Sequence, residues 1–411
     1  MRQLLSNRSF ILYWLVGITS ILASLALEFV VSLYAYDLTG SPLLFGAILS
    51  AVLVPRLILT PISGVIADRY PRKRIMLISL AFYILLLLSA TLYQLSTSAL
   101  GVIPLFALVL LIEMASILFS SANAAVLPMI VAPELLGQAN SFCSIYNELS
   151  YVLGPLIGGL VYGFFGFSAS LILITVCAGI SFVLLRLLPF PAQVPQGISA
   201  RPRVLLDLKQ GLSVIAKNKL LVYLVLVAPF LLNFFNVPVF DMVLVFYVRG
   251  TLGISPAGFS LFMALLAAAG VICAALAGKV YSDRRAVRFV SVMPVLVIGS
   301  MAVVLFSILA TRLAAPALLL TMSFLACSVI SATVGLFGIA QNTITQKTVS
   351  LDTLSRVMSF KRLSGLTAVP LGNLVFGLII QYTSLEVSVL VSIGGIAALF
   401  VVGRALSAQT G

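Results

Sequence analysis

The amino-acid sequence predicts an all-α membrane protein in which twelve transmembrane helices form two bundles of six. Three features carry this prediction: the composition, the length of the apolar runs and the distribution of basic residues. Of the 411 residues, 62% are hydrophobic and 9% are charged, and the mean hydropathy is +1.22. So few charged residues cannot cover the surface of a soluble protein of this length, which excludes a soluble fold.

Apolar runs of about twenty residues or more predict the transmembrane helices. A helix needs about 20 apolar residues to cross the ~30 Å hydrocarbon layer. The runs are continuously apolar, whereas the strands of a membrane β-barrel alternate in hydrophobicity. The twelve runs lie near residues 10–36, 43–67, 75–95, 101–127, 140–164, 167–188, 219–247, 256–280, 289–310, 316–341, 359–382 and 386–406.

The net charge of +13 indicates orientation in a membrane rather than nucleic-acid binding. With the N-terminus in the cytoplasm, 21 of the 24 Lys and Arg residues fall in cytoplasmic segments. The exceptions are Arg56, inside a span, and Arg249 and Arg312 on the outer side. Because basic residues concentrate in the cytoplasmic segments of membrane proteins, we expect both termini in the cytoplasm and a multi-pass location in the cell (inner) membrane. The lipid bilayer is then a partner of the chain, and nucleic acid is not.

A polar break that contains four prolines divides the chain into two halves. This break predicts a cytoplasmic linker at residues 189–218, between an N-terminal bundle at 1–188 and a C-terminal bundle at 219–411. An amphipathic helix is predicted inside the linker because apolar residues recur there at helical spacing. These residues are Leu205, Leu208, Leu212 and Ile215.

An internal repeat supports the division into two halves. Several residues of the first half recur in the second half at a constant offset of 218. They are Val131, Ser141, Phe142, Gly154, Leu156 and Gly159, which recur as Val349, Ser359, Phe360, Gly372, Leu374 and Gly377. Both halves begin on the same side of the membrane, which predicts two bundles related by an axis along the membrane normal.

Three motifs carry a resemblance to a known family. Residues 64–74, GVIADRYPRKR, resemble the signature loop of the major facilitator superfamily, G-x-L-A-D-R-x-G-R-K, and residues 278–285 resemble a degenerate second copy. Residues 154–159, GPLIGG, resemble the G-P-x-x-G-G core of the motif associated with the exporters of that superfamily, with Ser150 in place of its leading glycine. Residues 127–140 and 207–211 look like the macrolide-efflux branch of the superfamily.

The resemblance implies the major facilitator fold and a set of gating residues. Gly64 is expected to permit close approach between helices, and Arg69, Arg72 and Lys73 to bridge the two halves at the inner face. The alternative is that the basic residues only enforce orientation and that the glycines only pack helices. The gating candidates are Gly64, Asp68, Arg69, Arg72, Gly154, Pro155, Gly158, Gly159, Asp283 and Arg284.

Five ionisable residues inside apolar runs are the sharpest functional signal, because each costs about 2.5 to 3.5 kcal/mol near the bilayer centre. They are Glu28, Arg56, Glu113, Glu148 and Asp241. We expect Arg56 to neutralise Glu113, which lies at a similar depth. In the superfamily the first, fourth, seventh and tenth spans line the central cavity, so the resemblance places Glu28, Glu113 and Asp241 on lining helices.

A carboxylate in such a cavity is the expected proton carrier, since the chain has no histidine. Glu28 and Asp241 are the leading candidates for proton coupling. A structural ion pair is the alternative for each carboxylate, and for Glu148 a gating hydrogen bond is as well supported as contact with substrate.

The seventh span combines polar and aromatic residues with two prolines. Pro229 and Pro238 remove backbone hydrogen bonds, so a discontinuous helix is expected there. The cavity candidates are Asn233, Asn236, Phe234 and Phe240, although aromatic residues in such a span also commonly face lipid.

Together these features predict a monomeric secondary active transporter that exports small amphiphilic, drug-like or cationic molecules by proton antiport, a multidrug-resistance type of efflux. The alternatives are uptake by proton symport, export of a siderophore or lysolipid, and a non-transporting receptor or channel. An enzyme is not expected, because the chain has no nucleotide-binding glycine loop and no sizeable soluble domain. No cofactor and no metal site are expected, since the four cysteines lie singly in apolar runs.

Overall fold

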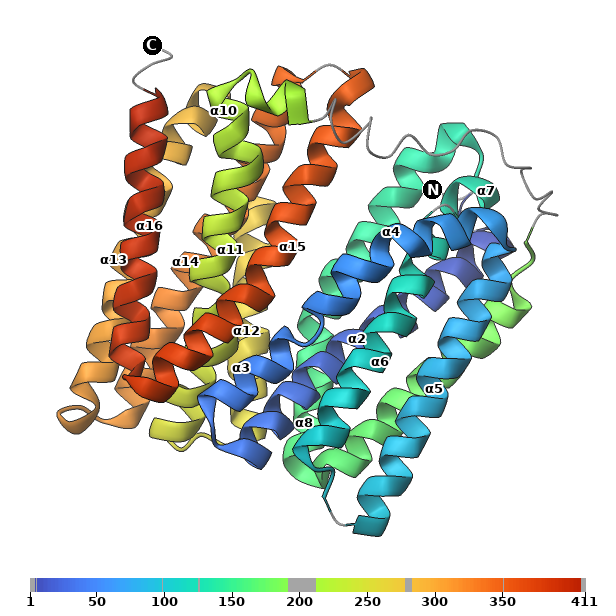
Figure 1. Ribbon diagram of the computed structural model, residues 1–411, viewed down its shortest axis with the longest axis horizontal. Coiled ribbons are helices and arrows are strands. Elements are labelled where there is room, and N and C mark those ends of the chain that lie inside the picture. The colour runs from blue at the N-terminus through green and yellow to red at the C-terminus, as the bar shows by residue number, and fades with distance from the viewer. Residues whose placement is uncertain are drawn as a thin grey trace. The chain divides into compact units, whose positions relative to one another are not determined.

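The computed structural model describes residues 4, 6–97, 99–124, 126–190, 212–277, 283–349 and 351–407, and every regular element in these ranges is a helix (Figure 1). The chain forms two compact units, which are described separately. Unit 1 comprises residues Met1–Gly40, Ala51–Ser199 and Ser255–Ala264, and unit 2 comprises Ser41–Ser50, Ala200–Ile254 and Leu265–Gly411. Each unit therefore includes one short segment, 41–50 or 255–264, from the sequence half that supplies most of the other unit.

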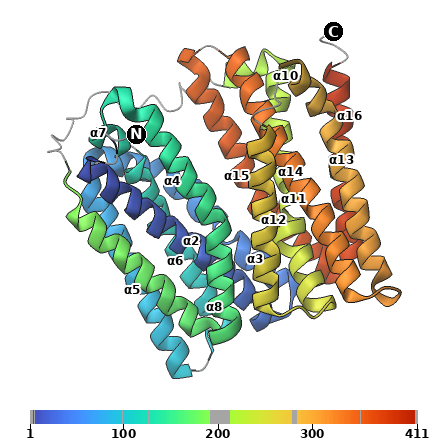
Figure 2. The same cartoon turned by 180° about the vertical axis from the view of Figure 1, so that it is seen from behind.

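Five helices form most of unit 1. They are α2 (Arg8–Thr39), α4 (Leu53–Arg69), α5 (Arg72–Thr97), α6 (Val102–Asn123) and α8 (Leu136–Leu187), with the short turns α7 (Leu127–Ile130) and η1 (Pro133–Leu135) between α6 and α8. Helix α2 lies beside α8, as Figure 2 shows, and α4 and α5 both pack against α6. The first turns of α12 (Pro256–Ala277) complete the unit.

The ends of α2 follow from its local sequence. Asn7 precedes the helix, and its side-chain oxygen accepts hydrogen bonds from the backbone N–H groups of Ser9 and Phe10, which satisfies donors that the first turn leaves unpaired. Gly40 ends the helix in the left-handed region at φ 55°, where its N–H donates to the carbonyl of Tyr36. Glycine adopts this conformation without steric cost.

Helix α8 contains the fifth and sixth predicted runs. The two runs are joined at Gly166, whose φ of 80° and ψ of −175° are not helical, and such angles are accessible mainly to glycine. Pro155 lies inside the first part of α8. The chain therefore reverses direction at a single residue instead of through a loop.

Unit 2 contains the remaining helices. They are α3 (Pro42–Ser50), α10 (Lys219–Val222), η2 (Tyr223–Val227), α11 (Ala228–Pro238), η3 (Val239–Val243), η4 (Val245–Thr251), the rest of α12, α13 (Asp283–Leu309), η5 (Ala310–Arg312), α14 (Pro316–Thr348), α15 (Leu351–Tyr382) and α16 (Leu385–Ser407). Helix α15 packs against α3 and α11, and α13 packs against α14 and α16.

The seventh predicted run is a continuous helix with three π-helical stretches, not the discontinuous helix that its prolines predict. The stretches are η2, η3 and η4, and each widens the helix so that an N–H reaches the carbonyl five residues earlier, as Leu252 does to Tyr247 at 2.9 Å. Such stretches often mark functional sites in helices. The backbone freed by Pro238 is thus re-paired by local widening.

Ten helices of the described residues are long and apolar enough to cross a membrane. The predicted number was twelve. The difference arises because α8 holds two predicted runs and because the apolar helix at Pro256–Gly270 is shorter than a full span. The chain is a multi-pass membrane protein, whereas the count of twelve, the bundle boundaries and the orientation of the termini stay predictions.

The predicted amphipathic helix of the linker falls mostly outside the described residues, including Leu205 and Leu208. Its last turn, residues 212–216, is helical. Ile215 is fully buried in a cluster with Leu221, Val225 and Val357 of unit 2, and Leu212 is exposed. This turn is therefore amphipathic and packs on unit 2.

Candidate functional site

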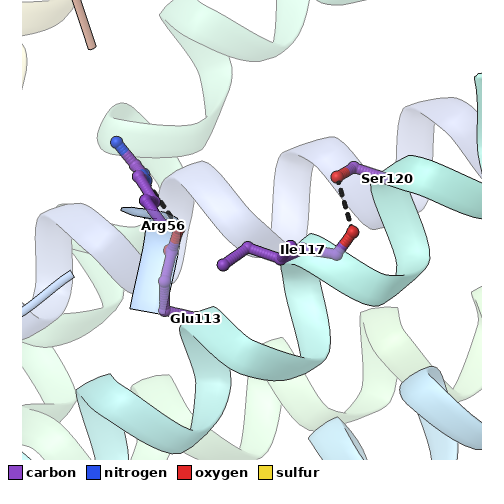
Figure 3. Close-up of polar contacts among 4 residues, drawn as sticks. All are labelled: Arg56, Glu113, Ile117 and Ser120. Atoms are coloured by element: carbon purple, nitrogen blue, oxygen red, sulfur yellow. Dashed lines mark hydrogen bonds and ion pairs between the residues drawn. The ribbon is translucent and has the colours of Figure 1, made fainter. Parts of the chain in front are cut away.

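An ion pair inside unit 1 joins α4 to α6. The Nε of Arg56 donates to Oε1 of Glu113 at 2.6 Å, and the Arg56 and Glu113 side chains are 34% and 14% exposed. Figure 3 shows the two side chains meeting between their helices. This contact confirms the expectation that Arg56 neutralises Glu113, and the partner is necessary because an unpaired charge at this depth is costly.

Glu28 belongs to the same neighbourhood. Its carboxylate, on α2, lies within electrostatic reach of both Arg56 and Glu113, and its side chain is exposed. We call Glu28, Arg56 and Glu113 the charged cluster. With both carboxylates ionised, the charged cluster carries two negative charges and one positive charge. One carboxylate is therefore in excess, and a single proton or a bound cation would neutralise the group.

The polar candidates of the seventh run lie in unit 2. Asn373 of α15 donates a hydrogen bond through its Nδ2 to the Asp241 carboxylate at 3.1 Å, and the Nδ2 of Asn233 donates to the carbonyl of Pro229 at 2.7 Å. Asn236 is buried, and its side-chain oxygen has no hydrogen-bond partner among the described residues. Asp241 thus has an amide neighbour from α15, whereas Glu28 has ionisable ones.

The two aromatic candidates of unit 2, Phe234 and Phe240, differ in their neighbours. The Phe234 ring stacks on Phe230, with 5.7 Å between centroids, and meets Phe235 edge-on at 4.9 Å. Phe240 is half-buried. Phe234 therefore belongs to an aromatic group within unit 2.

The glycines of the fifth run form a tight seam with α2 and with the first turns of α12. A Cβ on Gly154 would lie 2.8 Å from Cβ of Leu25, and one on Gly158 would lie 3.0 Å from the carbonyl oxygen of Ala26. A Cβ on Gly159 would overlap the Ser260 side chain. These glycines permit close helix contact, as expected for small residues in membrane helices.

The repeat-related glycines of unit 2 form a second seam. A Cβ on Gly372 would lie 2.6 Å from the carbonyl oxygen of Phe234, and one on Gly377 would lie 2.8 Å from that of Pro42. Gly46 of α3 approaches the backbone of Asn373 just as closely, at 2.5 Å from its carbonyl oxygen. Gly46 and Asn373 were not among the sequence candidates, although Asn373 stands at the repeat position of Pro155, and that offset could have identified it.

The structure describes part of the signature loop. A Cβ on Gly64 would meet no atom of the described residues within 4 Å, and the expected close helix approach at this glycine stays a prediction. The Nζ of Lys73 donates to the carbonyls of Arg186 and Leu188 at the end of α8. Both carbonyls belong to the N-terminal half of the chain, so the described contacts of Lys73 do not bridge the halves as expected.

The other gating candidates are placed only in part. Arg69 is exposed at the end of α4, and Arg72 is half-buried at the start of α5. Pro155 is half-buried beside Gly154. The side chains of Asp68, Glu148, Asp283 and Arg284 lie outside the described part of the chain, and so does Gly278.

No group of three or more Cys, Asp or Glu side chains suitable for a metal ion occurs among the residues that the structure describes. Cys143, Cys177 and Cys327 are free thiols.

Comparison with known proteins identifies a family and several relatives. A model of the Major Facilitator Superfamily matches residues 10–361. Macrolide efflux protein A of Streptococcus pyogenes is 24% identical over 58% of this chain, and an uncharacterized MFS-type transporter of Bacillus subtilis, YfiS, is 26% identical over 61%. The alignments span 59% and 58% of those relatives, so the chain matches less than two thirds of their length.

Solved structures share the fold across nearly the whole chain. The match to the nucleoside transporter NupG has a TM-score of 0.74 at 15% sequence identity. It covers 97% of this chain and 98% of the NupG chain. The match to a bacterial homologue of the iron transporter ferroportin, in an inward-facing state, has a TM-score of 0.72 at 18% sequence identity. It covers 97% of this chain and 98% of that homologue. At these identities the likeness concerns the fold alone.

Proposed function

Because the chain belongs to the major facilitator superfamily, we propose that it is a secondary active transporter that exports small amphiphilic or drug-like molecules in exchange for protons. The observation that carries this proposal is the charged cluster. Its excess carboxylate accepts one proton in one state of the transport cycle and releases it in another. Cargo moves by alternating access in the opposite direction.

Glu28 is the proposed proton carrier of the charged cluster. Arg56 is engaged by Glu113 at 2.6 Å, which leaves Glu28 as the carboxylate without a dedicated guanidinium. The chain contains no histidine, so no side chain that ordinarily titrates near neutral pH competes for this role. A cationic cargo next to the charged cluster would favour loss of the Glu28 proton, since each would neutralise the same excess charge.

Asp241 is the second proposed carrier, in unit 2. Its carboxylate lies in a π-helical stretch and accepts a hydrogen bond from Asn373. We propose that a proton or a cargo cation is exchanged at this carboxylate. Asn233, Asn236, Phe234 and Phe240 are proposed to contact cargo beside Asp241.

The glycine seam and the named relatives support export over uptake. The seam at Gly154, Gly158 and Gly159 holds helices in close contact, which suits a leak-tight closed state in an exporter. Relatives named macrolide efflux protein A match part of the chain. We propose further that the protein acts as a monomer in the cell (inner) membrane, with twelve spans and both termini in the cytoplasm.

The proton gradient is sufficient to drive such export. One elementary charge that crosses 100 mV yields about 2.3 kcal/mol. A single coupled proton therefore supports a cargo gradient of very roughly fiftyfold at that potential.

Proton movement in inside-out membrane vesicles tests the proposal. Vesicles that contain the protein are energised until their interior is acidic, a dye reports internal pH, and macrolides, cationic dyes and lysolipids are added singly. Addition of a transported compound should raise the internal pH, and control vesicles without the protein should not respond. Internal acidification on addition would indicate symport instead, and accumulation of a compound without any proton movement would contradict proton coupling.

A further inference from the structure

Unit 1 contains a cavity near the charged cluster, with hydroxyl groups set in a mainly apolar wall. The cavity has a volume of about 330 Å³ and is bounded by α2, α5, α6 and α8. Hydroxyl side chains line it from all four helices, and no lining residue is charged. Six of these residues are Ser20, Ser24, Tyr83, Ser116, Ser120 and Tyr146.

The residue spacing on α2 and α6 places the cavity-lining serines on the same helix faces as the carboxylates of the charged cluster. On α2, Ser20 and Ser24 are spaced four residues apart, and Glu28 follows after four more. On α6, Glu113 precedes Ser116 by three residues. Residues three or four apart occupy one face of a helix, so the serine-bearing faces that line the cavity continue to the two carboxylates. Figure 3 shows Glu113 and Ser120 along α6.

The other end of the cavity approaches the basic end of unit 1, where α2 begins at Arg8, α4 ends at Arg69 and α5 begins at Arg72. Asn123, the last residue of α6, also lines the cavity. Ser116 lies seven residues before Asn123, which is about 10 Å along a helix. The cavity therefore occupies the region between the basic end and the charged cluster.

One buried hydroxyl in the wall of the cavity needs a partner. Tyr83 is 7% exposed, and its hydroxyl has no hydrogen-bond partner among the described residues. An unsatisfied buried hydroxyl costs about 1–3 kcal/mol, and a water held by this hydroxyl and by the hydroxyl groups of the neighbouring helices would remove that cost. A cavity of this volume has room for about ten waters at ~30 Å³ each.

We propose that this cavity is a water-filled vestibule that carries protons between the basic end of unit 1 and the charged cluster. Water in the vestibule hydrogen-bonds to the Tyr83 hydroxyl and to the serines of α2 and α6. Protons then move along hydrogen-bonded water to Glu28, and each water that gains a proton on one side passes one on to the next. This role rests on the proposed proton coupling, whereas the presence of water in the cavity does not.

Cysteine labelling in membranes tests for water in the cavity without any cargo. The four native cysteines are replaced by alanine, and Ser24→Cys and Ser116→Cys are made separately. The matched control is Ile78→Cys on α5, whose side chain is exposed on an apolar stripe with Phe82 and Leu85. Ile78 lies six residues from Arg72, so its depth from the basic end is close to that of Ser116.

A sulfonated methanethiosulfonate, which cannot enter hydrocarbon, should label both serine-site cysteines at least tenfold faster than the Ile78→Cys control. Labelling of both at the control rate would overturn the proposal. Because the assay needs neither cargo nor a proton gradient, slow labelling together with proton-coupled transport would overturn the vestibule alone. Fast labelling without proton-coupled transport would overturn the proposed function and the proton-carrying role, but not the hydration.

A second variant tests the proton-carrying role. Tyr83→Phe removes the hydroxyl and keeps the ring, so the cavity retains its shape. The rate of cargo-induced proton movement should fall severalfold, while exchange of labelled for unlabelled cargo across the membrane is unchanged. An unchanged proton rate in Tyr83→Phe would contradict a route through the vestibule.

Discussion

At the residue scale, the charged cluster places one guanidinium within electrostatic reach of carboxylates from two other helices. Arg56 comes from α4, Glu113 from α6 and Glu28 from α2. The Arg56–Glu113 contact pairs two charges that are costly to leave alone in a membrane interior. In the proposed mechanism Glu28 is the carboxylate that responds to protons or cargo. The same guanidinium would then hold α4 on α6 and set the charge that a transported ion must balance.

The Arg56–Glu113 pair should be strongly coupled in stability. Arg56→Met leaves Glu113 and Glu28 without their positive neighbour. We expect the free energy of unfolding to fall by roughly 1–3 kcal/mol, which is less than the 3–5 kcal/mol of a fully buried pair because Arg56 is about a third exposed. The double variant Arg56→Met/Glu113→Leu should lose less than the single variant. Unfolding in detergent is measured for the native chain, Arg56→Met, Glu113→Leu and the double variant, and additive losses would mean that the pair is not coupled.

At the element scale, helix α8 contains both the non-helical residue Gly166 and the glycines that pack closely on α2. Gly166 reverses the chain with backbone angles that other residues avoid, and Gly154 and Gly158 bring α8 onto α2. A corresponding seam in unit 2 uses Gly372 and Gly377. The repeated glycines therefore have the same packing role in both units, because glycines at equivalent positions permit close contacts between helices.

Replacement of a seam glycine should be costly, and replacement of a glycine outside the seam should not. Gly154→Ala places a methyl group 2.8 Å from Leu25 and forces α2 and α8 apart. We expect a loss of about 1–3 kcal/mol in stability and a lower melting temperature in detergent. Gly179→Ala, on the same helix with no atom within 4 Å of the new Cβ, should be neutral or stabilising by up to about 1 kcal/mol. Equal effects of the two changes would mean that the seam is not tight.

The helices and the ion pair could be predicted from the sequence, because hydrophobic runs and the cost of buried charge leave few alternatives. The Arg56–Glu113 pair follows from two opposite charges at one depth. The expected contacts of Gly64 and Lys73 stay predictions, because a motif specifies residue types and not the helix faces that they meet. The vestibule could not be predicted, since its wall depends on how α2, α5, α6 and α8 are rotated about their axes.

At the scale of the whole molecule, each compact unit includes a short segment from the opposite sequence half. The first turns of α12 pack on Gly159 in unit 1, and α3 packs on α15 in unit 2. Movement between open states in an alternating-access cycle would have to change which neighbours these segments contact. The two glycine seams are the parts of the structure best suited to such sliding, because they present small side chains to their partners.

Glu28→Gln tests whether a proton carried by Glu28 drives export. Purified protein in vesicles is assayed for accumulation of labelled cargo driven by a proton gradient and for exchange of labelled for unlabelled cargo without a gradient. Glu134→Gln, at an exposed carboxylate in η1, is the control and should behave as the native chain. Glu28→Gln should lose gradient-driven accumulation and retain exchange, since alternation continues without a proton to couple. Full gradient-driven accumulation by Glu28→Gln would contradict the claim.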